Sequence, residues 1–183
     1  MGRQGLGRFY PAALELVPLF ILGCAIYLVV TGYAGLPGTI PTHFDFRGVA
    51  DGWGDRSSLW SLAGLSAFLY LLFTGITWFL GNSPDPKRWI NLPATVKENI
   101  TGAQAQQLMA FLGRCLLALK TLILGLFLCN IYLTIAIARG ETVTASYYHL
   151  LLAAAIGAVV IALLVRVFIL VYRAPAQNAP PRY

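Results

Sequence analysis

The chain has 183 residues, of which 58% are hydrophobic and 11% charged, and its formal net charge is +6. Soluble chains carry roughly 25% charged residues, so this chain lacks the polar side chains that the surface of a soluble domain needs, and we expect an integral membrane protein. The basic residues are scattered among apolar runs and form no patch, so we expect a lipid bilayer as partner and no nucleic acid.

Four segments are long and apolar enough to cross a membrane. A spanning helix needs roughly 20 mostly apolar residues, because the hydrocarbon core is about 30 Å thick. The segments lie at about 11–33, 59–81, 108–138 and 146–173. We therefore predict an all-α fold in which residues 1–173 form a single four-helix transmembrane domain. The polar, proline-rich stretch 174–183 is expected to be a disordered cytoplasmic tail.

The distribution of Lys and Arg predicts the orientation, because these residues prefer the cytoplasmic side. Seven lie on the side of the termini: Arg3, Arg8, Lys87, Arg88, Lys97, Arg173 and Arg182. Three lie on the opposite side: Arg47, Arg56 and Arg139. Both termini are therefore predicted to be cytoplasmic, which leaves the first loop outside the cell.

Four polar side chains within the spans are candidates for function, since such groups are unfavourable in lipid. They are Glu15, Arg114, Lys120 and Asn130. We expect Glu15 to pair with Arg114, which lies at a similar depth, if the first and third spans touch. The alternative for Arg114 and Lys120 is that each extends to the headgroups. Asn130 is expected to form a hydrogen bond between helices.

The first outer loop, residues 36–56, has an unusual composition. It combines two prolines, which fix φ, with four glycines, which permit turns that other residues resist. His43, Asp45, Asp51 and Asp55 offer imidazole and carboxylate groups that suit a metal ion. Their spacing matches no calcium loop or zinc helix. We therefore favour hydrogen bonds that hold a folded loop, followed by docking of a ligand or partner, and place metal binding third.

The loop also carries a motif that resembles a known family. Its residues are Leu36, Pro37, Ile40, Pro41, His43, Phe44, Gly48, Asp51, Trp53 and Gly54. This pattern resembles the bacterial and archaeal membrane family known as domain of unknown function 1648 (DUF1648), which also forms the N-terminal part of SdpI-type immunity proteins. The resemblance extends over roughly residues 10–140. It implies the inner (plasma) membrane of a prokaryote and, for SdpI-type members, immunity to a membrane-active peptide toxin together with ligand-linked signalling.

Three functions are compatible with these features. The favoured one is a non-enzymatic protein that recognises a peptide, a lipid or a partner protein through the loop 36–56, as an immunity-like protein or an accessory subunit. The alternative is a metal-dependent membrane enzyme that uses His43 and Asp51, and the third is a small oligomeric transporter. No catalytic residue or cofactor is assigned, because no haem, flavin or nucleotide motif is present. Small residues in the second and fourth spans, including Gly64 and Gly75, favour close helix contacts within the bundle or a homo-oligomer.

Overall fold

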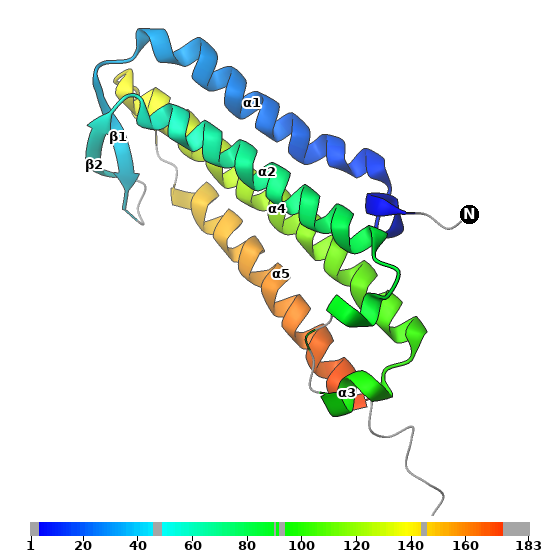
Figure 1. Cartoon of the computed structure of the whole chain (residues 1–183). Coiled ribbons are helices and arrows are strands. Elements are labelled where there is room, and N and C mark those ends of the chain that lie inside the picture. Colours follow the sequence, from blue (N-terminus) through cyan, green and yellow to red (C-terminus); the bar gives the residue numbers. More distant parts are fainter. Residues whose placement is uncertain (1–3, 46–48, 90, 92–93, 144–145, 174–183) are drawn as a thin grey trace, which may run out of the picture.

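A computed structural model describes residues 4–45, 49–89, 91, 94–143 and 146–173 (Figure 1). The long helices are α1 (Leu16–Gly32), α2 (Ser58–Asn82), α4 (Gly102–Ala138) and α5 (Ser146–Arg173), with the short helix α3 (Ala94–Asn99) before α4. Strands β1 (Thr39–Phe44) and β2 (Ala50–Asp55) form a hairpin between α1 and α2. Short 3-10 helices are η1 (Gly5–Arg8), η2 (Ala12–Glu15), η3 (Tyr33–Gly35) and η4 (Pro86–Trp89). The predicted tail 174–183 and the motif residue Gly48 lie outside the described residues.

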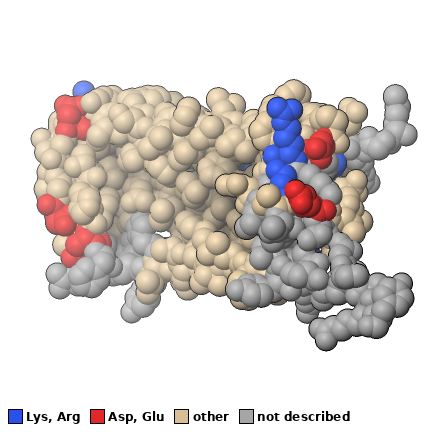
Figure 2. All heavy atoms as spheres, turned by 60° about the horizontal axis from the view of Figure 1, so that its bottom comes forward, with Lys and Arg blue, Asp and Glu red and all other residues tan. Residues whose placement is uncertain are grey.

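Four helical stretches have the length and apolarity that crossing a membrane requires: Ala12–Gly35, Ser58–Asn82, Gly102–Ala138 and Leu150–Ile169. Large apolar side chains such as Phe20, Leu71 and Leu164 are exposed along them. Figure 2 shows a broad band without charged side chains between the two ends of the face in view. A surface of this kind suits lipid and not water. The prediction of a multi-pass membrane protein with four such helices is confirmed, and the hairpin adds a small β element to the expected all-α fold.

Helix α4 is the centre of the bundle, because α1, α2 and α5 all pack against it. Figure 1 shows α1 and α5 on opposite sides of the pair formed by α2 and α4. Helix α4 has 37 residues and is therefore about 55 Å long, which exceeds the roughly 30 Å of the hydrocarbon core. Its first turns are polar and begin with a capping box, in which Thr101 and Gln104 exchange side-chain and backbone hydrogen bonds.

Two apolar clusters hold the bundle together, one at each end. At the hairpin end, Ile40 of β1 is fully buried among side chains that include Val29, Leu59 and Ile131. At the other end, Phe9 and Tyr10 of the N-terminal segment pack with Leu108 and Met109 of α4 and with Ile100. The loop segments at both ends are thus part of the core of the protein.

The close approaches between elements occur at glycines other than the two expected in the second span. A Cβ atom at Gly64 or Gly75 would meet no atom within 4 Å, so these two glycines create no close contact within the bundle. By contrast, a Cβ atom at Gly81 would lie 2.1 Å from the carbonyl oxygen of Gly5, and one at Gly113 would lie 2.5 Å from the ring of Phe9. Gly81 and Gly113 therefore provide the space in which the N-terminal segment packs.

Candidate functional site

The hairpin between α1 and α2 is a compact antiparallel pair of strands. Its register pairs Ile40 with Gly54, Pro41 with Trp53 and His43 with Gly52, with irregularities on either side of His43. A Cβ atom at Gly52 would lie 2.8 Å from the Cβ of His43, which is closer than side-chain carbons approach. His43 therefore leaves no room for a side chain at position 52. Gly52 lies outside the recognised motif. Thr42 likewise leaves no room for a side chain at Gly54, where an added Cβ would lie 2.9 Å from the methyl carbon of Thr42.

The base of the hairpin is anchored to the bundle. Ile40 and Pro41 are fully buried, and Leu36 joins Ile40 in the apolar cluster of α1, α2 and α4. At the base of the hairpin, Nη1 of Arg56 donates a hydrogen bond of 3.3 Å to the carbonyl oxygen of Leu36. The guanidinium of Arg56 also lies 5.0 Å from the centre of the Tyr33 ring, within the range of a cation–π contact. These contacts fix the direction in which the hairpin projects.

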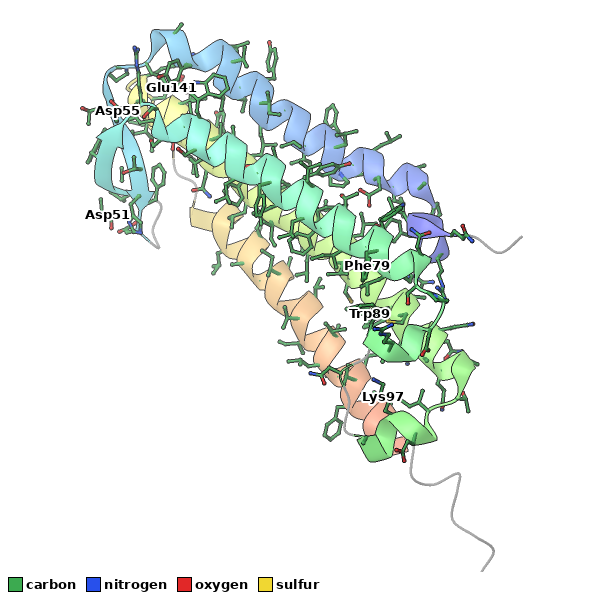
Figure 3. The ribbon with its side chains drawn as sticks, in the orientation of Figure 1. Asp51, Asp55, Phe79, Trp89, Lys97 and Glu141 are labelled. Carbon is green, nitrogen blue, oxygen red and sulfur yellow. The ribbon has the colours of Figure 1, made fainter. Side chains whose placement is uncertain are left out.

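The exposed side chains of the hairpin are its most chemically distinctive ones. Nδ1 of His43 lies 2.5 Å from Oδ1 of Asp51, and the two side chains are 72% and 48% exposed. The indole of Trp53 and the side chain of Val49 are also exposed. Figure 3 shows Asp51 near the far end of the hairpin, whereas Asp55 lies near its base. The site therefore joins an imidazole–carboxylate pair with exposed apolar side chains.

The other candidate residues of the loop shape it and do not add to this pair. Oδ1 of Asp45 accepts a hydrogen bond of 2.9 Å from the backbone N–H of Val49. Oδ1 of Asp55 accepts one of 2.7 Å from the backbone N–H of Ser57, and hydrogen bonds from the Ser57 hydroxyl and backbone lower the pKa of Asp55. Pro37 is exposed in the turn before β1, and Phe44 is half-buried.

The four metal candidates do not come together as a ligand set. Within the described part of the chain, no group of three His, Cys, Asp or Glu side chains is close enough to hold an ion. Only His43 and Asp51 meet, whereas Asp45 and Asp55 each bind a backbone N–H. Catalytic zinc sites have three protein ligands. His43 and Asp51 alone therefore fall short of the site that a zinc enzyme would need.

A second polar cluster lies inside the bundle and centres on Lys120 of α4, which is only 1% exposed. Its Nζ atom lies 2.5 Å from Oε2 of Glu15 and donates a hydrogen bond of 2.8 Å to the hydroxyl of Thr74 on α2. It also lies 5.0 Å from the centre of the Tyr70 ring. Oε1 of Glu15 accepts a hydrogen bond of 2.6 Å from the hydroxyl of Tyr10. Burial and this contact raise the pKa of Tyr10, so Tyr10 stays a donor.

The structure corrects three expectations about the polar residues of the spans. Glu15 pairs with Lys120 and not with Arg114, because Lys120 lies on the face of α4 that points into the bundle. Lys120 consequently does not extend to the headgroups. Arg114 is exposed and donates from Nε to the carbonyl oxygen of Phe9 over 3.3 Å. Asn130 donates to the carbonyl oxygen of Leu126, in its own helix, over 2.9 Å and not to another helix.

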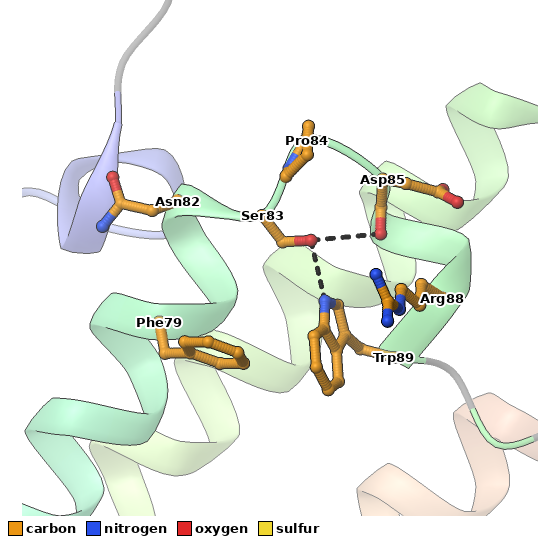
Figure 4. Close-up of a pocket in the computed structure, with 7 residues that line it drawn as sticks. All are labelled: Phe79, Asn82, Ser83, Pro84, Asp85, Arg88 and Trp89. Carbon is orange, nitrogen blue, oxygen red and sulfur yellow. Dashed lines mark hydrogen bonds between the residues drawn. The ribbon is translucent and has the colours of Figure 1, made fainter.

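A small pocket lies at the end of α2 that is remote from the hairpin (Figure 4). Its volume is about 230 Å³, and its walls come from residues 79–89. Nε1 of Trp89 donates a hydrogen bond of 2.7 Å to the hydroxyl of Ser83, which in turn donates to the carbonyl oxygen of Asp85 over 3.2 Å. The Trp89 ring packs edge-on against Phe79 with centres 4.9 Å apart. These contacts fold the chain back on α2 after the helix ends.

Comparison with known proteins gives a family match over part of the chain. Residues 19–67 match the family described as Domain of unknown function (DUF1648). The matched segment runs from α1 through the hairpin into α2, and the resemblance read from the loop motif is confirmed there. No curated protein and no solved structure matches the chain.

Proposed function

We propose that this membrane protein, part of which matches DUF1648, is not an enzyme and that it recognises a partner polypeptide through the exposed side chains of its β1–β2 hairpin. One observation carries the proposal: the hairpin is anchored near its base by fully buried Ile40 and Pro41, whereas Trp53 and the His43–Asp51 pair are exposed. A loop that served only to connect two helices would not need both a buried anchor and this set of exposed side chains.

The anchoring of the hairpin favours tight recognition. Binding costs less free energy when the contact surface is already ordered, because less conformational freedom is lost. Tryptophan is among the residues that contribute most to binding when they are buried at the centre of an interface. The exposed indole of Trp53 on an ordered hairpin has these properties.

The charges near the hairpin indicate the chemistry of the partner. Acidic residues at this end of the bundle are Asp45, Asp51, Asp55 and Glu141, and the described basic residues are Arg56 and Arg139. A cation on the partner would be attracted to Asp51 and would also suit the face of the Trp53 ring. We therefore propose a partner polypeptide that presents a basic side chain beside an apolar one, as a cationic amphipathic peptide does.

The proposed orientation puts the hairpin outside the cell and both termini in the cytoplasm of a prokaryote. The excess of Lys and Arg on the side of the termini supports this orientation, since basic loops are retained in the cytoplasm. The acidic residues near the hairpin agree with an outer position. The partner would then be an extracellular or periplasmic peptide, or the outer segment of another membrane protein in a complex with this chain.

The experiment that tests the proposal is purification of the tagged chain from native membranes in a mild detergent, with identification of the polypeptides that accompany it. We expect a partner that Trp53→Ala and Asp51→Asn each remove. Loss of a central tryptophan contact costs about 2 kcal/mol or more, which weakens binding about thirtyfold. Trp78→Ala is the matched control, because Trp78 is equally exposed but lies in a span. A partner retained by both hairpin variants would contradict the proposal.

A further inference from the structure

Two hollows lie along α4 beside the N-terminal segment, apart from the hairpin. The first is a groove of about 380 Å³ whose walls include Leu14 and Val17 on one side and Leu117, Thr121 and Leu122 of α4 on the other, with Arg114 at one end. The lining of this groove is almost entirely apolar. The second is a more polar hollow of about 400 Å³, lined by Arg8, Gln106 and Gln107 among others.

The spacing of the lining residues puts both hollows on one face of α4. Gln107, Ala110, Arg114, Leu117 and Thr121 follow one another at intervals of three or four residues, which is the spacing of neighbours on one face of a helix. Going along α4, the polar hollow comes first, Arg114 follows, and the apolar groove continues beyond it. The two hollows therefore form one strip with a polar and an apolar half.

The position of this strip matches one leaflet of a membrane. Leu14 belongs to the first turns of the first span, Ala12–Gly35, so Arg114 lies near the level at which that span enters the membrane. From Arg114 to Leu122 the helix rises about 12 Å, which is close to half of the roughly 30 Å hydrocarbon core. The apolar groove thus extends from the membrane surface almost to the middle of the bilayer.

The charged groups of the strip are basic. Nε of Arg114 donates to the carbonyl oxygen of Phe9, and Nη1 of Arg8 donates to the carbonyl oxygen of Ser83 over 2.7 Å. Both guanidinium groups are thereby held in place beside the hollows. Glu15, which follows the groove residue Leu14 in the sequence, is turned into the bundle toward Lys120. No carboxylate lines either hollow, so the described strip favours an anion. Guanidinium groups suit the geometry of phosphate oxygens.

We propose that this strip is a binding site for an anionic phospholipid. One acyl chain lies in the groove between Leu14 and Leu117, and the phosphate lies at Arg114, with Gln106 and Gln107 as hydrogen-bond donors to the headgroup. The groove supplies apolar contact along the chain. Arg8 and Arg114, with no carboxylate lining the hollows, favour a lipid of net negative charge over one whose phosphate is accompanied by a cationic choline. This inference does not depend on the function proposed for the hairpin.

The test is native mass spectrometry of the full chain, delipidated in detergent and titrated with phosphatidylglycerol or with phosphatidylcholine of the same acyl chains. We expect the wild type to bind phosphatidylglycerol at least tenfold more tightly. Arg114→Gln should abolish that preference, and Arg114→Lys should keep part of it. Arg166→Gln, which removes an exposed charge on α5, should leave the preference unchanged.

Two substitutions test the groove itself. Leu14→Trp and Ala118→Trp fill it from opposite walls and should each weaken the binding of both lipids, in variants whose circular dichroism shows a folded protein. Leu14 is exposed, so at least that variant should fold. Equal binding of the two lipids by the wild type would overturn the proposal. So would unchanged binding in Arg114→Gln, equal losses in Arg114→Gln and Arg166→Gln, or full binding in a folded groove variant.

Discussion

Lys120 and Glu15, 105 positions apart in sequence, connect the middle helix of the bundle to the start of α1 through a distance of 2.5 Å between Nζ and Oε2. Thr74 adds a contact from α2. Because Lys120 is fully buried in a membrane-spanning helix, the three elements can pack only in an arrangement that satisfies this charge. The pair therefore specifies how the helices are rotated and aligned.

Removal of one partner of this pair should destabilise the protein strongly. Glu15→Gln or Lys120→Met leaves the other group without its partner, which typically costs about 3–5 kcal/mol at buried sites. The double variant, which leaves no buried charge, should lose less than the sum of the two single losses. The free energy of unfolding in detergent, measured by denaturant titration, checks this. Additive losses would show that the two side chains do not interact.

The docking of the N-terminal segment should depend on Gly81. A methyl group there would lie 2.1 Å from the carbonyl oxygen of Gly5, so Gly81→Ala should displace η1 from the end of α2. We expect faster hydrogen exchange over residues 5–10, measured by mass spectrometry. Gly75→Ala is the control, since a methyl group at that position meets no atom within 4 Å. Equal exchange in the two variants would show that Gly81 has no such role.

The hairpin should depend on Gly52 in a similar way. A Cβ atom at this position would clash with that of His43 across the strands, so Gly52→Ala should loosen the hairpin and expose its amides to exchange. Gly38→Ala, just before β1, should have little effect because its methyl group enters open space. Protection of the hairpin amides that is the same in Gly52→Ala and the wild type would contradict the observed register.

Replacement of His43 by Gln distinguishes recognition from metal-dependent catalysis. A glutamine amide can still donate a hydrogen bond to Asp51 but is a poor metal ligand. We therefore expect the variant to keep the partner of the wild type. We also expect plasma mass spectrometry to find no stoichiometric metal in either protein. A metal present in the wild type and lost from His43→Gln would favour the enzyme.

The sequence was sufficient to predict those features of the fold that depend on residues close together in the chain. Length and apolarity alone predicted the four long helices. The motif around His43 predicted the match of residues 19–67 to DUF1648. Both signals depend on residues that are close together in the chain, so neither requires knowledge of how the helices pack.

The arrangement of the polar groups was not predictable in this way, because it depends on how each helix is rotated. Arg114 and Lys120 lie about 120° apart around α4, so only one of them can face Glu15, and the sequence does not indicate which. The greater depth of Lys120 in its span was the available signal, since a deep lysine reaches the headgroups less easily. The contribution of Tyr10 and Thr74 and the role of Gly52 also depend on tertiary contacts.

The central claim is that the exposed side chains of the hairpin contact a partner polypeptide, and photo-cross-linking from position 53 tests it most directly. A photoreactive amino acid replaces Trp53 in one strain and Trp78 in another, which are 57% and 58% exposed. After irradiation of intact cells, we predict a discrete protein adduct from position 53, and lipid adducts from position 78. Only lipid adducts from both positions would mean that Trp53 anchors the hairpin in the membrane surface, and the recognition function would be contradicted.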